Sequence, residues 1–459
     1  MAKIIIRNFG AIGEWSTELD NHNFCVLTGP QASGKSTIAK CIYYFRSAKE
    51  VICDAFSDYL EEGEAVYSYS NAKNFQNYVL SRLRARFMEL FGTSKSMSKD
   101  LYLYYEYKDT DTYFKIRLKD VQFDADADPF ENYIDIRLGN KLYSYLRTMT
   151  DKATNVKTIR KELDTLLEDP YEPYFITAGR CVLSLMASQL KYMFFKMDDR
   201  QKSRMDYATR KLIEYISELK EQMDEGLEGM VYSYIQEQDI RHLRANDRNP
   251  QSLISTFHEL IALSKKIIKG TYKVVGGEER IYLHSDQEKF IKINYASSGQ
   301  QEALWIINML FYLAVSGKKA FVIIEEPESH LFPDAQRLIT TFIAAISNLG
   351  CQVLLTTHSP YVLGTVNNLR YAAFLSDKSE ICEQVQKIVP KYGMLDALSA
   401  FFVNVDPETG TATPVNCIDN SEAGLIDNDV IEGASEKIHD DYIDLFDLYF
   451  NMDEQNEGM

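Results

Sequence analysis

Residues 29–37 carry the residue types and the spacing that bind a nucleotide phosphate. They fit the pattern G-x-x-x-x-G-K-[ST], in which two glycines let several backbone N–H groups point to one place. Lys35 adds a full positive charge for the β- and γ-phosphates, and the Ser36 hydroxyl is a hard oxygen ligand suited to Mg²⁺. The predicted phosphate-binding residues are Gly29, Pro30, Gln31, Ala32, Ser33, Gly34, Lys35, Ser36 and Thr37.

Two carboxylates, Glu325 and Glu326, end an apolar stretch that we predict to be a strand over 320–324. The carboxyl end of a parallel strand faces the crevice in which an α/β sheet binds its ligand. One carboxylate there can hold Mg²⁺, and the next can polarise the water that attacks the γ-phosphate. We therefore expect Glu325 to be a metal ligand together with Ser36, and Glu326 to be catalytic.

A histidine and a serine-rich turn add to this set. His358 directly follows the apolar strand 352–357, and we interpret it as a sensor of the γ-phosphate. A Ser-Ser-Gly turn opens a long apolar helix, where it either binds an anion or only caps the helix with serine. Because no G-x-S-x-G elbow surrounds Ser298 or Ser359, a serine hydrolase is disfavoured. The predicted binding residues of the turn are Ser297, Ser298, Gly299 and Gln300.

The elements around the phosphate-binding loop have the required order of strand, glycine loop and helix. Phe24–Thr28 reads as a buried strand, and residues 38–45 read as a helix. A polar loop is expected to join an earlier strand, Lys3–Arg7, to Phe24–Thr28. Alternating residues over 101–107 and 112–118 predict a β-hairpin.

Helical patterns dominate residues 51–92 and 182–269. The charged middle of the second region, 196–248, fits either two coiled-coil arms or an ordinary helical subdomain. The apolar stretch 303–315 is shorter than the ~20 residues that span a bilayer. The apolar part of residues 1–7 is too short for a signal peptide. We therefore expect a cytoplasmic protein with no membrane contact.

Two charged stretches give weaker signals. Arg82, Arg84 and Arg86 either form a solvated helix face or contact nucleic acid or an acidic partner. Alternating aspartates over 124–128 have the spacing of a calcium loop but lack its glycine and its later glutamate. We expect an acidic turn there, with no metal.

The bulk composition describes an ordinary globular chain of 459 residues with a net charge of −17. This excess of negative charge argues against sequence-independent coating of nucleic acid, which requires positive charge. The seven cysteines are scattered and include no C-x-x-C pair. A reducing compartment without structural zinc is the simpler interpretation.

Taken in order, the stretches GPQASGKS, ASSGQ, VIIEEPESHLFP and TTHSP resemble ABC-type ATPases of the RecF/SMC/OLD group. The resemblance covers about the first 50 residues and 290–375, the two halves of one nucleotide-binding α/β head. Residues 174–180 also resemble a strand and loop, often Pro-Ala-x-Arg, that this group carries near the site. The resemblance implies an ABC-type P-loop ATPase fold with a helical insertion, and ATP and Mg²⁺ as cofactors.

The resemblance also implies a role for each matching residue. Glu325 would be the Walker B acid, Glu326 the water-activating group and His358 the switch histidine. Ser297 and Gly299 would belong to the signature motif, and residues 328–330 to the D-loop. Glu325 stands where aspartate is usual in this group. Ala296 and Ser298 replace the leucine and the first glycine of L-S-G-G-Q.

Within this group, compact chains with these motifs resemble ATPase subunits of bacterial antiphage defence systems of the Septu (PtuA-like) and PARIS (AriA-like) types. Such subunits form homo-oligomers, as dimers of dimers or larger rings, and hold a separate nuclease effector. We therefore expect a homo-dimer or a higher oligomer, with an HNH or Toprim nuclease supplied in trans. The trigger, a phage protein or DNA, stays open.

Three other functions stay open: a RecF-like repair ATPase, a nucleotide-gated scaffold without turnover, and an OLD-like chain with its own nuclease. The third is disfavoured because little chain remains after residue 375 for a Toprim domain. We place the first part of the ATPase head at 1–180, a helical insertion at 181–270, the second part of the head at 271–400, and an acidic C-terminal segment at 401–459.

Overall fold

A computed structural model describes most of the chain. It leaves out residues 1, 20–21, 71, 93–96, 120–132, 153–154, 182–195, 198–204, 221–222, 224–225, 238–249, 284–285, 379–380, 428, 432–442 and 444–459. The aspartates of 124–128 and most of the acidic end of the chain therefore lie outside the described residues. Within the part that is described, no helix is both long enough and apolar enough to cross a membrane. All seven cysteines are described, and none forms a disulfide.

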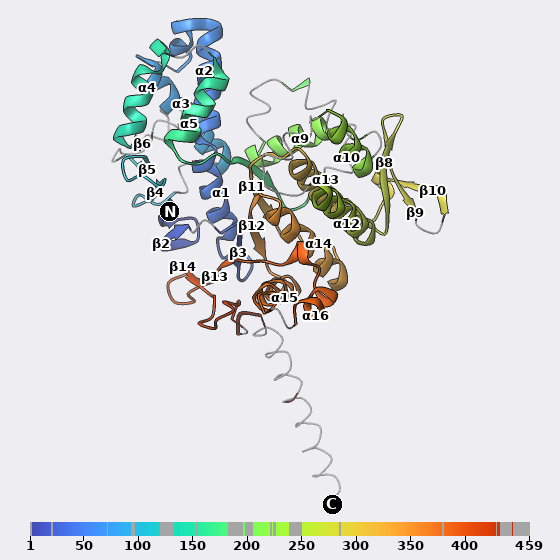
Figure 1. Ribbon diagram of the computed structural model, residues 1–459. Helices are drawn as coiled ribbons and strands as arrows, with labels where there is room; N and C mark the ends of the chain where they lie inside the picture. The colour runs from blue at the N-terminus through green and yellow to red at the C-terminus, as the bar shows by residue number, and fades with distance from the viewer. Residues whose placement is uncertain are drawn as a thin grey trace, which may run out of the picture.

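Parallel strands form one end of the main sheet, with β7 at its edge (Figure 1). Their runs are almost wholly apolar because helices cover both faces. Neighbouring side chains enter different cores: Val322 and Ile324 join one, and Phe321 and Ile323 join the other. In spatial order the strands are β7 (Glu172–Ile176), β11 (Ala320–Glu325), β12 (Gln352–Thr357), β3 (Phe24–Thr28) and β13 (Ser399–Val405).

Beyond β13 the sheet continues as a largely antiparallel wing. The hairpin predicted from alternation over 101–118 is present there as β4 and β5, with Tyr105 opposite Phe114. The strands of the wing are, in spatial order, β14 (Ala412–Asn416), β2 (Ile12–Leu19), β1 (Ala2–Phe9), β4 (Tyr102–Glu106), β5 (Tyr113–Leu118) and β6 (Ile134–Leu138).

Strand β2 corrects the predicted polar loop between the first two strands. Its outward residues are Glu14, Ser16 and Glu18, and this polar row gave the stretch the composition of a loop. Ile12 and Trp15 are buried, and the Trp15 ring meets the Phe401 ring edge-on at 5.4 Å. The contact with Phe401 depends on a strand almost 400 positions later, so local sequence did not indicate it.

The helices of the N-terminal part of the chain share one core with one face of the sheet. They are α1 (Lys35–Arg46), α2 (Ala48–Glu62), η1 (Gly63–Ser70), α3 (Phe75–Phe91), α4 (Asn140–Lys152) and α5 (Val156–Leu166) (Figure 1). The three arginines of α3 make contacts inside the chain. Arg82 pairs with Asp58, and Arg84 donates to the Ile134 carbonyl. The Arg86 guanidinium lies 3.7 Å from the centre of the Tyr207 ring. These contacts give the arginines a structural role.

The region predicted as a helical insertion contains α9 (Tyr207–Lys220), α10 (Gly226–Glu237) and α12 (Pro250–Ile268). These helices pack against the body of the ATPase head, chiefly against α13 (Ser298–Val315), α14 (Pro333–Asn348) and β7 (Figure 1). Most of their buried apolar side chains belong to the same core as α13, while Tyr207 and Ala208 of α9 join the other core. The described part of the insertion is therefore a packed helical subdomain.

The remaining elements complete the second half of the head. They are β8 (Gly270–Val275), β9 (Glu278–Leu283), β10 (Asp286–Lys292), η4 (Ile293–Tyr295), α15 (Pro360–Ser376), α16 (Cys382–Ile388) and η5 (Lys391–Gly393). Strands β8 to β10 form a separate three-stranded sheet, in which β8 and β9 are paired as an antiparallel hairpin. Because β13 and β14 belong to the main sheet, the head extends past residue 400, where we had placed its end.

A buried ion pair fixes the C-terminal end of α1 to the loop before β7. Arg46 donates to both carboxylate oxygens of Asp169, at 2.6 and 3.0 Å, and both side chains are almost fully buried. Burial raises the pKa of Asp169, but the Arg46 guanidinium outweighs it, so this pKa lies below the usual 3.8.

We expect Asp169→Asn to lower the free energy of unfolding by about 3–5 kcal/mol, because it leaves the Arg46 charge buried without its partner. A depressed carboxylate pKa stabilises the fold above the unfolded-state value, and this stability is lost as the pH falls below it. Urea denaturation at neutral pH and below pH 3.8 measures both effects. A variant as stable as the wild type at neutral pH would contradict this role.

Candidate nucleotide-binding site

The loop of residues 29–37 joins β3 to α1, and its backbone requires glycine at two places. Gly29 and Gly34 have φ of 142° and 101°. A Cβ atom on Gly29 would lie 2.2 Å from the Val403 carbonyl oxygen, and one on Gly34 would lie 2.7 Å from the Ile12 side chain. Strands β13 and β2 therefore press directly on the loop. The N-terminus of α1 begins at Lys35, where free N–H groups favour an anion.

Lys35 lies folded over the loop. Its ammonium donates to the carbonyls of Gly29 at 2.9 Å and Pro30 at 2.7 Å. Its Nζ also lies 3.4 Å from Nδ1 of His358, which follows β12. Burial lowers the pKa of Lys35 to about 8, while Glu326 and Glu328 oppose that shift. The loop thus holds a cation that phosphate oxygens can take over.

Glu326 and His358 meet beside this cation. The Nε2 atom of His358 lies 3.3 Å from Oε1 of Glu326. Since Lys35 can only donate, Nδ1 of His358 accepts from it and Nε2 carries the proton toward Glu326. Glu326 has a left-handed φ of 44°, and its N–H donates to Thr356. Such a backbone costs roughly 1–3 kcal/mol and is typical of functional positions.

Glu328 holds His358 in place, a role that sequence reasoning missed. Its Oε1 accepts from the Thr357 hydroxyl at 2.7 Å and from the His358 backbone N–H at 2.8 Å. The sequence resemblance assigned Glu328 only to the D-loop, residues 328–330, and gave it no role toward His358. The signal available was its spacing, two residues beyond Glu326, but the partner strand could not be identified from spacing alone.

Glu325 has the features of a ligand for a hard cation. Its side chain is buried, and Oε2 accepts the Ala178 N–H at 3.3 Å. Its Oε1 is buried and has no hydrogen-bond partner among the described residues. Carboxylate and hydroxyl oxygens suit Mg²⁺, so Glu325 and the exposed Ser36 at the start of α1 fit the predicted metal site.

Arg180, in the loop after β7, is the second residue whose role the sequence left open. Its guanidinium is fully buried and donates to the carbonyls of Thr177, Glu325 and Glu326 at 2.7, 2.7 and 3.0 Å. Burial lowers the pKa of Arg180, and the carboxylates, led by Glu302, oppose that shift. The side chain thus holds the backbone of both candidate carboxylates.

The serine turn lies at the start of α13. Ser297 caps the helix, and its side chain and that of Gln300 form a reciprocal capping box. Ser297 and Ser298 are exposed, while Gly299 is buried and a Cβ atom there would lie 2.6 Å from the His330 carbonyl oxygen. Of the residues predicted to form the site, the structure brings together the phosphate-binding loop, Glu326 and His358. The contacts of Ser297 within the described chain are with its own helix turn.

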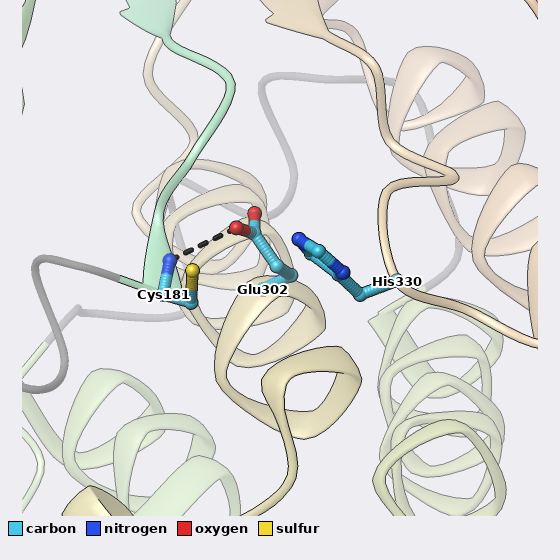
Figure 2. Close-up of side chains that lie close together, drawn as sticks. All are labelled: Cys181, Glu302 and His330. Carbon is cyan, nitrogen blue, oxygen red and sulfur yellow. Dashed lines mark hydrogen bonds between the residues drawn. The ribbon is translucent and has the colours of Figure 1, made fainter.

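Cys181, Glu302 and His330 form a compact cluster beside α13 (Figure 2). Their ligand-type atoms lie within 4.8 Å of one another, and such groups suit Zn²⁺. Both Glu302 oxygens are already engaged: Oε1 accepts the Cys181 N–H at 2.9 Å, and Oε2 lies 2.9 Å from Nε of Arg180. Glu302 is therefore held by Arg180 and the Cys181 backbone, and we assign the cluster no metal.

Solved SMC head structures cover most of this chain at low identity. The SMC head bound to the C-winged helix domain of ScpA is 11% identical with a TM-score of 0.42, covering 90% of this chain and 96% of that chain. The head from Thermotoga maritima is 10% identical with a TM-score of 0.37, covering 90% and 97%. An SMC head with an extended coiled coil, bound to the C-terminal domain of ScpA derived from Pyrococcus furiosus, is 13% identical with a TM-score of 0.39, covering 91% and 96%.

No protein of curated function matches this sequence. The family model described as the AAA ATPase domain, AAA_15, matches residues 1–363, which is most of the chain. The parallel strand order, together with the phosphate-binding loop, the two carboxylates and His358 at the carboxyl ends of β3, β11 and β12, defines an α/β ABC-type P-loop ATPase head. The chain therefore belongs to the AAA ATPase domain family.

Proposed function

We propose that this chain hydrolyses Mg-ATP at sites shared between two copies of itself. The observation that carries the proposal is the unbroken series of contacts from Lys35 through His358 to Glu326. It joins a phosphate-binding cation to a carboxylate able to accept a proton from water. A serine-capped turn or an acidic loop alone would not supply this combination.

Each residue has a separate task in this reaction. Lys35 neutralises the β- and γ-phosphates, and Ser36 and Glu325 would hold Mg²⁺, which supplies further positive charge there. Water attacks the γ-phosphorus while the bond to the ADP oxygen breaks, and Glu326 takes the water proton. His358, held by Glu328, orients the Glu326 carboxylate.

The second copy would supply the signature residues Ser297, Ser298, Gly299 and Gln300. Ser297 and Ser298 are exposed at the N-terminal end of α13, which favours a negative group. The described contacts of Ser297 leave it on the surface of its own protomer. ATP would then be the ligand that joins two heads, and the phosphate-binding loop would be half of the site.

For the biological role we infer regulation of a nuclease supplied in trans, as part of antiphage defence. The inference rests on the sequence resemblance to such subunits. The described residues after α15 form α16, β13 and β14, and both strands complete the ATPase sheet. The described C-terminal part is thus used by the ATPase head itself.

Two substitutions test the catalytic assignment. Lys35→Ala should abolish ATP binding, because the phosphates lose their main positive charge. Glu326→Gln should keep binding and lower turnover by at least about 100-fold, because the amide cannot accept a proton. Equilibrium binding of a fluorescent ATP analogue and phosphate release measure the two effects. Turnover by Glu326→Gln at the wild-type rate would contradict the role of Glu326.

The lowered pKa of Lys35 makes ATP binding depend on pH. Phosphates favour the charged ammonium, so binding above pH of about 8 should take up a proton, and affinity should fall by up to about tenfold per pH unit. Below that pH the ammonium is already charged and the dependence should vanish. Calorimetry in two buffers of different ionisation enthalpy counts the proton. Binding without proton uptake above this pH would exclude Lys35 as the titrating group.

The defence role is tested with the chain and its neighbouring genes together. Cells that carry the whole locus should resist phage infection, and Lys35→Ala should remove that resistance because assembly requires ATP. Efficiency of plating measures the effect. If the locus gives no protection but Lys35→Ala sensitises cells to DNA damage, the repair ATPase is the correct interpretation.

A further inference from the structure

The signature helix and the catalytic carboxylates of one protomer are joined by a buried ion pair. Glu302 lies on α13, one turn after the exposed Ser298, and its side chain is fully buried. Its Oε2 lies 2.9 Å from Nε of Arg180, whose side chain is also fully buried. The two terminal nitrogens of the guanidinium donate to the Glu325 and Glu326 carbonyls.

A second contact also joins Glu302 of α13 to the loop that follows β7. Figure 2 shows the Glu302 side chain reaching from α13 to the backbone of Cys181, the residue after Arg180. The Cys181 N–H donates to Oε1 of Glu302 at 2.9 Å, so both carboxylate oxygens engage the loop that follows β7. From the same loop Ala178 donates to the Glu325 carboxylate. The loop is thus held by α13 on one side and by the end of β11 on the other.

We propose that the Arg180–Glu302 pair transmits the position of the signature helix to Glu325 and Glu326, so that closing one composite site sets the catalytic geometry of the other. Arg180 and Glu302 are positioning residues in this account. The proposal rests on the shared site proposed above, since only there does the signature of one copy meet the nucleotide of the other.

The physical basis is that no part of this path can relax independently. Buried groups at interior packing density transmit small displacements, because there is no free volume to absorb them. A buried charge also resists separation from its partner, because water cannot replace the partner. A shift of the first turn of α13 toward a partner's nucleotide therefore moves Arg180. Through Arg180 it moves the backbone from which the Glu326 side chain extends.

Glu302→Gln tests the coupling with little change in shape. It keeps an oxygen for the Cys181 N–H and removes the charge that holds Arg180. We expect ATP affinity of the free protomer to stay within about twofold of the wild type, since Lys35 and its loop are untouched. The kcat should fall by about 10–100-fold, and a wild-type Hill coefficient above one for ATP turnover should fall to one.

Asp169→Asn is the matched control, because it breaks another buried arginine–carboxylate pair that does not touch Glu325 or Glu326. It should lower the melting temperature at least as much as Glu302→Gln while keeping the cooperativity of the wild type. If Glu302→Gln behaves like this control in rate and Hill coefficient, the pair is only structural and the proposal is wrong. A wild-type protein whose ATP turnover shows no cooperativity would also overturn the proposal.

A readout without turnover separates this proposal from the ATPase assignment. In a Glu326→Gln background, Mg-ATP should slow amide hydrogen exchange at Ala178 and Cys181, and Ser297→Arg should abolish that effect. Adding Glu302→Gln should also abolish it if the pair transmits the closure. If the amides are protected equally with and without Glu302→Gln, the coupling is refuted but the assignment of ATP hydrolysis stands. If the wild type does not turn over ATP, the ATPase assignment is refuted, but the result of the exchange experiment is not affected.

Discussion

Negative charge gathers at the carboxyl end of β11, and the buried Arg180 guanidinium is what balances it. Glu302, Glu325, Glu326 and Glu328 all act on Arg180 electrostatically. The guanidinium donates to the Glu325 and Glu326 carbonyls and forms an ion pair with the Glu302 carboxylate at the same time. Without it, these like charges would repel one another and the strand end would lose its fixed backbone. Glu325 and Glu326, the two carboxylates proposed to act on Mg-ATP, extend from this framework.

The fold and much of the site could be predicted because their signals are local. The pattern at 29–37 and the apolar strand before Glu325 can be recognised from neighbouring residues alone. In the structure His358 contacts the Lys35 ammonium, and Glu326 contacts His358. Strand β2 was missed because its polar outer row resembles a loop, while its buried Trp15 rests on Phe401 from the far end of the chain. Such long-range contacts leave no periodic trace in the sequence.

Arg180 and Glu328 show the same limit at the site. Each is recognisable in sequence as part of a motif, but its task depends on which strand end lies beside it. Parallel pairing of β11 with β7 and β12 places the loop of Arg180 and the segment of His358 on either side of Glu326. The signature turn is the opposite case: its capping box explains its local sequence fully, so the structure of one protomer leaves its second role to be tested.

The central claim is that one nucleotide lies between the loop of one copy and the signature of another. Mixing Lys35→Ala with Ser297→Arg tests it most directly. Each homodimer carries one defect in both sites, whereas the heterodimer carries both defects in one site and leaves the other intact. Phosphate release should therefore be absent from either variant alone and return on mixing. It should reach at most about a quarter of the wild-type rate, and less to the extent that the defective second site no longer sets the geometry of the intact one. If mixing the two variants restores no activity, the site is not shared and the account is wrong.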